Sequence, residues 1–570
     1  MAAMDHWDFF FLTCILVSTV ATVYFNYHRR PARQKLPPGP KGIPFFGNMF
    51  QLPVAKQYRK LREWALQYGD IYYFRIGPLP VVVLNSAEAA DELFINRSQN
   101  FSSRIPPHVA HDIVSDGQAM AFLPYGAEWK AARRALQNSL GPGPSKALRV
   151  IQELEARVLL YDFLCHNNRH VSQFQAEGPH GEIPDGHWFA IIRRYTTSII
   201  LNLMYGARVH KLHDNPELHK LYDILANLLH VAQAGRYLAD TFPILRRLPN
   251  FLAPWRTEAR NMHDWEFSFW RSMVDDCRAA MQKGTSRESF VSDYLQKRAG
   301  AGAEDAPGKG ITDDGWMRDK FLAYTAGGVL EAGSDSTAVT IQSFILFMLS
   351  HPRCIRQAQE ELDKVIGANR LPGFEDMERL PYVVACIKET LRRRPTTPMG
   401  LPHASLEDDF YRGYFIPKGS VVIGNVWAMH MDPKRYVNPT AFDPDRFYAD
   451  GKLTQWGSGP GFQDRDHYIF GWGRRYCQGS HIAEQSLFIV LSRLLWGFNF
   501  NAPLDLKTGQ LMIPDVADED ATWTDGTFSG PHVFPVAFTA RSDKHAEVIR
   551  KAYEDAQIEW QALGLAVDLR

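Results

Sequence analysis

A glycine-rich loop that carries one cysteine and runs directly into a helix restricts this chain more than any other feature. The loop spans Phe470–Gly479 and reads FGWGRRYCQG, and the apolar pattern of Ser480–Leu495 is typical of a buried helix. Free N–H groups and the helix dipole favour a thiolate at such a helix start. We therefore interpret Cys477 as a functional anion. The alternative is a buried structural cysteine in a glycine-rich turn.

The neighbours of Cys477 support this interpretation. Gly471, Gly473 and Gly479 permit backbone conformations and a close approach that other residues would block, so a flat ligand can lie against the loop. Phe470 is expected to shield the sulfur from water. Arg475 offers a planar guanidinium that suits a carboxylate.

Composition narrows the class of protein. The chain has 570 residues, of which 45% are hydrophobic and 12% aromatic, so it can bury a large core. Lysine plus arginine and aspartate plus glutamate both total 63, and this zero net charge argues against nucleic acid as a partner. The six cysteines show no CxxC spacing, which excludes a disulfide framework and a zinc ribbon.

The amino end carries an apolar run. Phe9–Phe25 has no charge, Asp5 and Asp8 precede it, and a basic cluster follows between His28 and Lys35. This pattern predicts an uncleaved transmembrane helix within residues 1–28, with the following chain in the cytosol. A signal peptide or a buried core helix is the alternative, but a signal peptide would place its basic residues before the run and a small-residue cleavage site after it.

The remaining chain is expected to form one domain. Residues 29–48 are basic and proline-rich and predict a stiff hinge. The stretch at 299–310 resembles a linker, but it directly precedes a helical pattern that runs to about Ser350, so we interpret it as a surface loop. Residues 49–570 are then expected to form a single domain.

The secondary-structure pattern is mainly helical with small β-sheets. Strands are predicted at Ile71–Ile76 and Val81–Leu84, joined through Gly77-Pro78, and further strand pairs near Tyr414–Val422. We find no nucleotide-binding glycine motif: the nearest match, at 457–461, has the wrong spacing.

The cysteine loop resembles the haem-binding loop of the cytochrome P-450 family, and other motifs match in that family's order. Trp129–Arg133 resembles the WxxxR helix, and Ala332–Thr337 resembles the oxygen-binding stretch of the central helix. Glu389–Arg392 resembles the ExxR motif, and Arg446 its arginine partner. Short motifs are weak singly, but their common order makes a chance match implausible.

The resemblance implies a role for each matched residue. Cys477 is expected to be the axial ligand of the iron of haem b. The propionates are expected to contact Trp129, Arg133, His403 and Arg475. The remaining expected haem contacts are Phe470, Gly471, Gly473, Gly479, Ala332 and Gly333.

The ExxR residues have a physical interpretation of their own. Glu389 and Arg392 lie on one helix face at a spacing of three residues, and Arg446 can join them. A buried network of this kind is costly to break, so we interpret it as structural support for the cysteine loop. The alternative is a solvated ion pair.

The central helix carries the expected proton relay. Ala332 and Gly333 lack bulk and leave room for a diatomic ligand, and Asp335 and Ser336 supply an acid and a hydroxyl. The family usually has threonine at the position of Ser336, so the methyl group that restricts the rotamer is missing. Thr337 is a neighbouring hydroxyl that could substitute. The alternative is a small-residue helix crossing.

The function implied is that of a membrane-anchored haem-thiolate monooxygenase with the P-450 fold. It would hydroxylate or epoxidise a small to medium apolar substrate with O₂ and two electrons from NADPH. The electrons would come through a separate NADPH-cytochrome P-450 reductase on the endoplasmic reticulum, with cytochrome b5 as a second candidate donor. Lys130, Arg134 and Arg474 are candidates for the docking surface.

Two other function classes stay open. One is a haem-thiolate isomerase or dehydratase that uses no O₂, and the other is a non-catalytic haem sensor. The resemblance is greatest to fungal enzymes of secondary metabolism, which suggests an aromatic or polyketide-type substrate. The candidate pocket residues are Phe122, Val329, Met399, Leu401 and Phe528. The sequons at Asn96 and Asn100 are expected to stay unmodified in the cytosol.

Overall fold

A computed structural model describes residues 35–166, 187–210, 216–233, 235–448, 461, 463–505, 508–526 and 528–564. The predicted transmembrane segment, residues 1–28, lies outside this set. Within the described residues, no single helix has the length and hydropathy needed to cross a membrane. Two consecutive helices, Asp319–Ser350 and Pro352–Val365, meet these criteria together and bend by 106° where they join.

Helices dominate the described chain, as the sequence pattern predicts. The long helices are α2 (Gln57–Tyr68), α5 (Ala127–Leu140), α7 (Arg149–Cys165), α8 (Trp188–Tyr205), α9 (Pro216–Val231), α11 (Pro254–Gln282), α12 (Phe290–Gly300), α13 (Asp319–Ser350), α14 (Pro352–Val365), α15 (Pro381–Arg393), α18 (Ser480–Gly497) and α19 (Asp543–Ala562). The short helices are α3 (Ala87–Asp91), α4 (Ser98–Phe101), α6 (Pro142–Ala147), α10 (Leu238–Thr241), α16 (Val426–His430) and α17 (Asp445–Tyr448). Single turns of other helix types are η1 (Met49–Gln51), η2 (Glu92–Asn96), η3 (His108–Val114), η5 (Pro243–Arg247), η6 (Asn250–Leu252), η7 (Phe374–Arg379) and η8 (Gly473–Arg475).

The strands form one four-stranded sheet and two two-stranded antiparallel sheets, β4-β5 and β7-β8. They are β1 (Ile71–Ile76), β2 (Leu79–Leu84), β3 (His403–Ala404), β4 (Asp409–Tyr411), β5 (Tyr414–Ile416), β6 (Val421–Gly424), β7 (Phe498–Asn501) and β8 (Ala537–Ala540). The order in the larger sheet is β1-β2-β6-β3, with β6 parallel to β2 and antiparallel to β3. The first predicted hairpin is confirmed, with Ile71 opposite Leu84.

The strands near residues 414–422 exist, but they do not pair with each other. β5 pairs with β4 across the turn at Arg412-Gly413, where both residues have positive φ. β6 instead pairs with β2, more than 300 residues earlier in the chain, and places Val422 beside Val82 in the core of the sheet. The local pattern indicates strands but carries no information about this distant partner.

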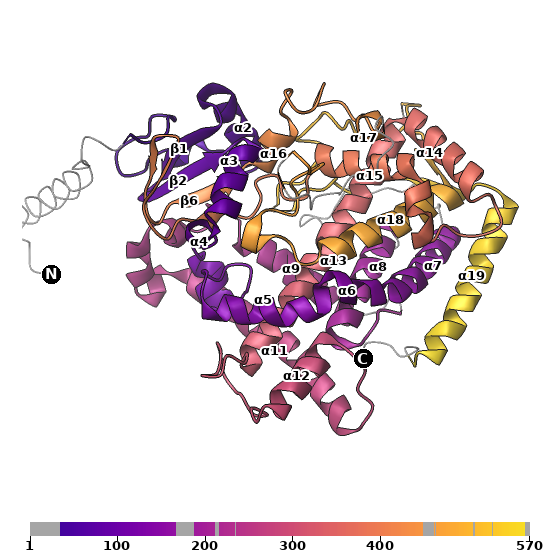
Figure 1. The fold of residues 1–570 in the computed structure, drawn as a ribbon, viewed down its shortest axis with the longest axis horizontal. Helices are drawn as coiled ribbons and strands as arrows, with labels where there is room; N and C mark the ends of the chain where they lie inside the picture. Colours follow the sequence, from indigo (N-terminus) through magenta and orange to yellow (C-terminus); the bar gives the residue numbers. More distant parts are fainter. Residues whose placement is uncertain are drawn as a thin grey trace, which may run out of the picture.

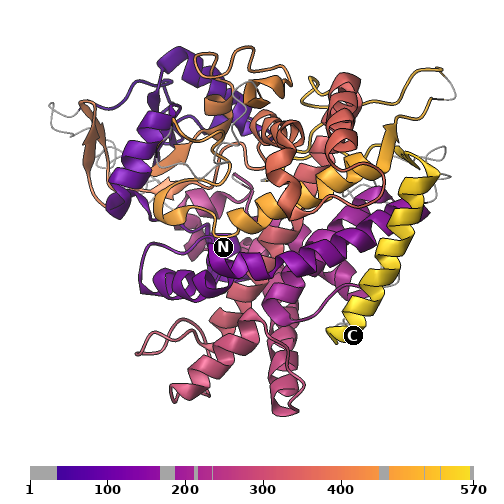
Figure 2. The same cartoon turned by 45° about the vertical axis from the view of Figure 1, so that its right-hand side comes forward.

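The helix α13 is the centre of the helical body. It has 32 residues, is apolar over most of its length, and packs against α8, α11, α15 and α18. The sheet and α2 lie on one side of the molecule in Figure 1, whereas α19 follows the opposite edge. The view in Figure 2 shows α11 and α12 projecting below α13. The helix begins at Asp319, later than the sequence pattern suggests, because the bridge between Ile311 and Met317 folds the preceding residues into a turn.

The described part of the proline-rich hinge lies against the sheet. The Pro38 carbonyl accepts a hydrogen bond from the N–H of Tyr73 at 2.8 Å, and the Asn48 N–H donates to the Arg75 carbonyl at 2.6 Å. A Cβ at Gly39 would lie 1.8 Å from the Tyr73 carbonyl oxygen, so only glycine fits this approach. From Pro38 to Asn48 the segment is therefore attached to β1 and does not form a free spacer.

Candidate active site

Cys477 lies at the end of a tightly closed loop before α18. Its backbone N–H donates to the Phe470 carbonyl at 2.9 Å. Gly471 and Gly473 both have positive φ, at 75° and 54°. A Cβ at Gly473 would also lie 2.0 Å from the Phe94 carbonyl oxygen. The loop thus needs glycine at Gly473 for its backbone conformation and for its contact with η2.

The Cys477 side chain is accessible although it lies within the protein. Burial raises the pKa of its thiol. The backbone N–H of Gly479 and the Arg133 guanidinium act in the opposite direction. A cysteine that is accessible although protein surrounds it faces an internal space. The Arg133 guanidinium and the Gly479 N–H near its sulfur favour the thiolate, in which a metal ion can take the place of the proton.

Three partly buried arginines, Arg104, Arg133 and Arg475, gather beside this space. Burial and the mutual repulsion of these cations lower the pKa of Arg475 to about 8, and burial lowers the pKa of Arg104 and Arg133 to about 10. Within the described residues, none of the three forms an ion pair with a carboxylate. Buried unpaired cations are costly, so the cluster is suited to an anion that this part of the chain does not itself supply.

The arginines also connect the cysteine loop to the rest of the protein. Arg475 donates to the carbonyl groups of Ser102 and Leu123 at 2.8 Å and 2.6 Å. Its guanidinium lies 4.4 Å from the ring centroid of Trp129. Arg133, one turn further along α5, donates to the Tyr476 carbonyl at 2.6 Å. Trp129 and Arg133, predicted from one motif, and Arg475, predicted from another, are thus neighbours in the structure.

His403 is buried against the same region. Its Nδ1 lies 2.6 Å from the Phe101 carbonyl oxygen, and its ring stacks on Phe94 with centroids 4.1 Å apart. Burial and the charges of Arg104 and Arg475 lower its pKa to about 3, so the imidazole is neutral. Nδ1 therefore donates to the carbonyl.

Arg104 is a site residue that the motifs did not predict. It follows Ser103, which bridges to Ala404, and this bridge brings residues 101–104 beside His403. Its Nη1 donates to the Pro402 carbonyl at 2.7 Å, whereas its buried Nε has no partner. No local pattern marks this arginine as buried. The only signal is tertiary, namely the pairing of its segment with β3.

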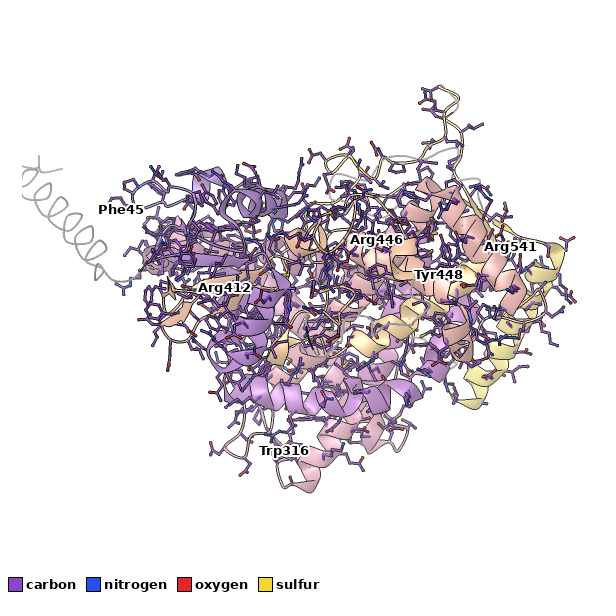
Figure 3. All side chains as sticks on the ribbon, turned by 45° about the horizontal axis from the view of Figure 1, so that its top comes forward. Phe45, Trp316, Arg412, Arg446, Tyr448 and Arg541 are labelled. Atoms are coloured by element: carbon purple, nitrogen blue, oxygen red, sulfur yellow. The ribbon has the colours of Figure 1, made fainter. Side chains whose placement is uncertain are left out.

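The ExxR prediction is matched by a fully buried network. Arg392 donates from Nε and Nη2 to the two Glu389 oxygens, each at 2.7 Å, and neither side chain is exposed. Arg446, which is labelled in Figure 3, approaches Glu389 from α17 at 3.1 Å. Arg392 also donates to the carbonyl groups of His430, Pro439 and Ala441.

A histidine links this network to the cysteine loop. The Nε2 of His430 accepts a hydrogen bond from the N–H of Tyr468 at 2.9 Å, and its Nδ1 lies 2.9 Å from the Arg392 carbonyl oxygen. Burial lowers the pKa of His430 well below its usual value, so Nδ1 carries the single proton. The ring thereby connects Arg392 of α15 to Tyr468, which lies two positions before Phe470. The buried network can in this way support the loop that presents Cys477.

One row of residues on α13 is partly exposed, although most of this helix is buried. Gly328, Ala332 and Ser336 follow one another at intervals of four residues and are partly exposed or exposed, whereas most of this helix is buried. Gly333 faces elsewhere: a Cβ there would lie 2.7 Å from Ile200 of α8. Ala332 therefore provides the open position, while Gly333 permits the close contact of two helices.

The acid and the hydroxyl of the predicted relay have different surroundings. Asp335 forms an ion pair with Arg193 of α8 at 2.8 Å, with side-chain exposures of 13% and 19%. The Arg193 guanidinium also lies 4.1 Å from the ring centroid of Tyr222. The Ser336 hydroxyl donates to the Ala332 carbonyl at 2.7 Å, and Thr337 is buried. Ser336 is thus the hydroxyl beside the internal space.

Three segments that carry predicted pocket residues meet at α13. The Thr340 hydroxyl lies 3.1 Å from that of Thr396, and the Thr396 carbonyl accepts from the N–H of Ser529 at 2.8 Å. Val329 lies on α13 itself, and Phe528 directly precedes Ser529. Met399 lies three residues after Thr396 and packs against Tyr58 and Trp427. Leu401 is 42% exposed. Phe122 belongs to another cluster, with Val109 and Val231.

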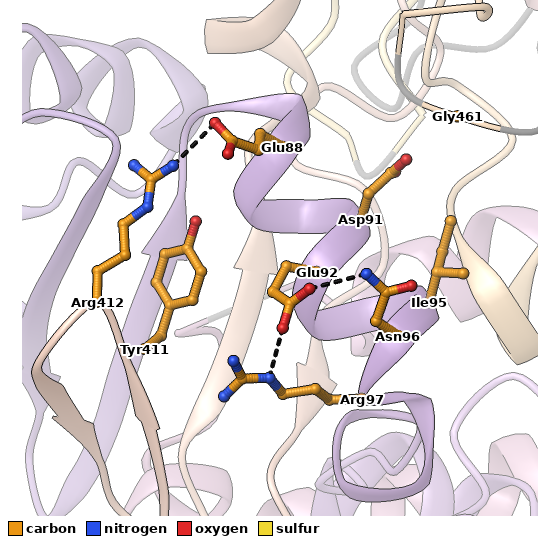
Figure 4. Close-up of a pocket in the computed structure, with 9 residues that line it drawn as sticks. All are labelled: Glu88, Asp91, Glu92, Ile95, Asn96, Arg97, Tyr411, Arg412 and Gly461. Atoms are coloured by element: carbon orange, nitrogen blue, oxygen red, sulfur yellow. Dashed lines mark hydrogen bonds and ion pairs between the residues drawn. The ribbon is translucent and has the colours of Figure 1, made fainter.

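A separate hollow lies between η2 and the β4–β5 hairpin. It has a volume of about 460 Å³ and is lined mainly by charged residues (Figure 4). Arg412 pairs with Glu88, and Glu92 accepts from Asn96 and Arg97, each at 2.8 Å. This hollow is lined by none of the predicted site residues. Its charges neutralise one another, so we interpret it as part of the surface.

The comparison with known proteins agrees with the motif order. A family model, "Cytochrome P450", matches residues 37–513. The chain belongs to the cytochrome P450 family. Cytochrome P450 monooxygenase 231 of Postia placenta is 54% identical to this P450 over 98% of its chain and 99% of the relative. The enzyme is thus a cytochrome P450 monooxygenase, and the predicted family and enzyme class are confirmed.

More distant relatives also span nearly the full chain. Cytochrome P450 monooxygenase verL of Clonostachys rogersoniana is 35% identical over 95% of this P450 and 93% of the relative. Cytochrome P450 monooxygenase fogE of Aspergillus ruber is 34% identical over 92% of both chains.

The site has the chemistry that a haem group requires. Cys477 offers an accessible sulfur for the iron, and the cluster of Arg104, Arg133 and Arg475 lacks the anion that two propionates would provide. Among the described residues, no group of three histidines, cysteines or carboxylates could hold a metal ion directly. A porphyrin held by one thiolate therefore fits the residues present.

Proposed function

We propose that this P450 uses haem b to hydroxylate or epoxidise a small to medium apolar substrate, with two electrons from NADPH. The observation that carries the proposal is the accessible Cys477 beside a partly buried cluster of arginines, Arg104, Arg133 and Arg475, that form no ion pair with a carboxylate among the described residues. The bound haem would supply the iron at which O₂ is activated, because thiolate ligation favours O–O cleavage.

The residues of the chain would bind the haem and transfer protons. Arg104, Arg133 and Arg475 would neutralise the propionates. A propionate near His403 would favour the protonated form of this histidine, so that Nε2 could donate to it. Ser336 would pass a proton into the space beside Ala332, with Asp335 behind it. The proton relay argues against the isomerase and sensor alternatives, which have no need for one.

We propose that the electrons arrive from a separate NADPH-cytochrome P450 reductase, with cytochrome b5 as a second donor. Lys130 and Arg134 are exposed on α5, which also carries Arg133 beside the cysteine loop. Arg474 has local partners, since its Nε donates to Ser98 at 3.2 Å and its Nη1 to Tyr125. Lys130 and Arg134 are thus the better candidates for docking.

We propose a location on the endoplasmic reticulum membrane, with the catalytic body in the cytosol. Exposed apolar side chains support it, and they come from two adjoining segments. The first contains Phe45 (Figure 3) and Phe50, and the second contains Phe251. The rings of Phe46 and Phe242 join the segments, with centroids 6.2 Å apart. A large exposed apolar patch is typical of a membrane or protein contact.

We propose a substrate from fungal secondary metabolism, of aromatic or polyketide type. Relatives alone do not specify the substrate of this P450, so its own pocket residues must determine which substrate binds. Val329 and Phe528 lie on segments that adjoin the accessible row of α13, and both are partly exposed. Leu401 is the most exposed of the candidates. Apolar side chains around such a space favour an apolar ligand.

Spectroscopy and O₂ consumption test the proposed function. The reduced protein under carbon monoxide should give the strongly red-shifted Soret band of thiolate ligation, and Cys477→Ser should abolish it. Purified protein with NADPH and reductase should consume O₂ and convert a substrate found by spectral titration of phenols, terpenoids and fatty acids. A red-shifted band with peroxide rearrangement but without O₂ uptake would instead indicate the isomerase class. An unshifted band would exclude the haem-thiolate site.

A further inference from the structure

A buried arginine and a nearly buried glutamate join two distant segments of the chain. Arg394 directly follows α15, and Glu519 lies 125 residues later. The Arg394 Nη1 donates to the Glu519 carboxylate at 2.7 Å, with side-chain exposures of 0% and 15%. Within the described residues, Glu519 is the one carboxylate that pairs with Arg394. Separating a buried cation from its partner is costly, so the two segments should keep this contact.

Aromatic side chains hold the ion pair in place. The Arg394 guanidinium lies 4.1 Å from the ring centroid of Trp523 and 5.6 Å from that of Trp427. The Glu519 carboxylate also accepts from the Tyr58 hydroxyl at 2.7 Å. Tyr58 lies on α2 and Trp427 on α16, and their ring centroids are 5.0 Å apart. The pair is therefore fixed relative to α2, α15 and α16.

The pair also contacts a turn near the end of the chain that lies on α13. Residues 523–531 form this turn, which an antiparallel bridge closes at its two ends, and we call it the late turn. The Arg394 Nη2 donates to the Ser529 hydroxyl within it. At the next residue, Gly530, an added Cβ would lie 2.7 Å from Cγ1 of Val339. The backbone of the late turn thus lies directly against α13.

This contact adjoins the row of α13 that ends at Ser336. Val339 is partly exposed and follows Ser336 by three residues, so both lie on one side of the helix. The Thr340 hydroxyl donates to the Ser336 carbonyl at 2.9 Å and lies 3.1 Å from the Thr396 hydroxyl. The Thr396 carbonyl in turn accepts from the Ser529 N–H at 2.8 Å. The late turn therefore meets α13 about one helical turn beyond Ser336.

We propose that the Arg394–Glu519 ion pair positions the late turn and thereby sets how far the internal space extends beyond Ser336. The inference rests on the proposed function, because it requires haem and a substrate beside this serine. Phe528 is partly exposed and directly precedes Ser529, so a shift of the turn would move this predicted pocket side chain. Arg394 and Glu519 are positioning residues, since they act through Ser529 and the turn.

The ion pair should matter for bulky ligands and not for small ones. One helical turn is about 5.4 Å long, so a small ligand at the iron does not reach the late turn, whereas an apolar ligand with several rings does. Loss of the pair leaves the turn free to move away, and a bulky ligand then loses part of its apolar contact. The pair is thus a specificity determinant for substrates that extend beyond Ser336.

Two azoles test this distinction, because both bind ferric haem through an imidazole nitrogen. Imidazole itself is the small probe, and clotrimazole, which carries three further aromatic rings, is the bulky one. In spectral titrations of the ferric holoenzyme, Glu519→Gln should raise the dissociation constant of clotrimazole several-fold and leave that of imidazole unchanged. Ser529→Ala removes the hydroxyl contact with Arg394 but no charge, so it should change the ratio in the same direction by a smaller factor.

Asp520→Asn provides the matched control. This neighbouring carboxylate is 76% exposed and pairs with Arg59 at 3.0 Å, so its loss removes the same charge from the same segment. The variant should retain the wild-type ratio of the two dissociation constants. A change in Asp520→Asn as large as that in Glu519→Gln would overturn the inference, because the effect would then follow from charge alone.

Thermal unfolding separates positioning from stability. If Glu519→Gln unfolds at a lower temperature but keeps the wild-type ratio, the pair is only structural and the inference is wrong. If this variant retains no haem, Ser529→Ala decides, and an unchanged ratio there would also overturn the inference. If wild type bound both azoles but consumed no O₂ with NADPH and reductase, the proposed function would fail, while the azole ratio would still report on the late turn.

Discussion

The Arg193 guanidinium donates to the Asp335 carboxylate at 2.8 Å and joins α8 to α13 one residue before Ser336. Burial lowers the pKa of Arg193, but the charge of Asp335, the neighbouring Tyr222 and the hydrogen bond to Asp335 together raise it above its usual value. The acid of the predicted relay is thus also a structural ion pair. Its two roles can be separated, because one affects unfolding and the other affects the use of NADPH.

A double-mutant cycle should measure the structural role. Arg193→Gln and Asp335→Asn should each lower the free energy of unfolding, since each leaves one polar group without its partner. The double variant should lose less than the sum, by about 1–3 kcal/mol, as is usual for residues in contact. Thermal unfolding of the holoenzyme, followed by haem absorbance, provides the measurement. Additive losses would show that the pair contributes nothing to stability.

Ser336 should control the fraction of NADPH that yields product. Its hydroxyl donates to the Ala332 carbonyl beside the internal space, so Ser336→Ala removes the nearest proton donor. Product per NADPH should fall, within a range that reaches about 10²-fold if no water substitutes, and peroxide should rise. Ser336→Thr should retain or improve the ratio because its rotamers are restricted.

A buried neighbour provides the control for Ser336. Ser334→Ala removes a hydroxyl from the opposite side of α13 and should leave product per NADPH unchanged. Substrate binding, measured by spectral titration, should be similar in all variants. Unchanged coupling in Ser336→Ala and in the Ser336→Ala, Thr337→Val double variant would show that neither hydroxyl carries protons.

Arg104 should be needed for retention of haem. Arg104→Ala removes one of three cations from the buried cluster, so the propionates would lose a charge-assisted hydrogen bond. The absorbance ratio of haem to protein after purification should fall, and haem transfer to apomyoglobin should become faster. Arg134→Ala, an exposed arginine on α5, serves as the control and should retain haem. Equal haem retention in both variants would exclude Arg104 from the binding site.

Alanine substitutions at Gly473 and Gly471 allow a matched comparison within the cysteine loop. Both have positive φ, but a Cβ at Gly473 would meet the Phe94 carbonyl oxygen at 2.0 Å, whereas no atom lies within 4 Å of a Cβ at Gly471. Gly471→Ala should therefore cost about 1–3 kcal/mol of folding free energy from backbone strain. Gly473→Ala should cost more and displace the thiolate band under carbon monoxide. Similar stabilities would show that the loop can move away from η2.

The local motifs of the sequence were sufficient to predict the family, and several residues that they mark lie close together in the structure. The spacing of FxxGxRxCxG, ExxR and WxxxR requires particular residue types within a few positions, and such short-range constraints are visible in the chain itself. The same holds for the hairpin β1–β2, whose two strands adjoin a tight turn, and for α18, which follows Cys477 at once.

Only the tertiary structure determined which groups meet across long distances in the chain. Arg104 becomes a site residue because Ser103 bridges to Ala404, and Gly333 lies against Ile200 because α8 packs against α13. A sequence pattern indicates which face of a helix is apolar. How deeply a side chain is buried, and which charges lie near it, depends on the element that packs against that face. The sequence alone therefore determined the family and the motifs around Cys477, whereas packing decided which charges surround them.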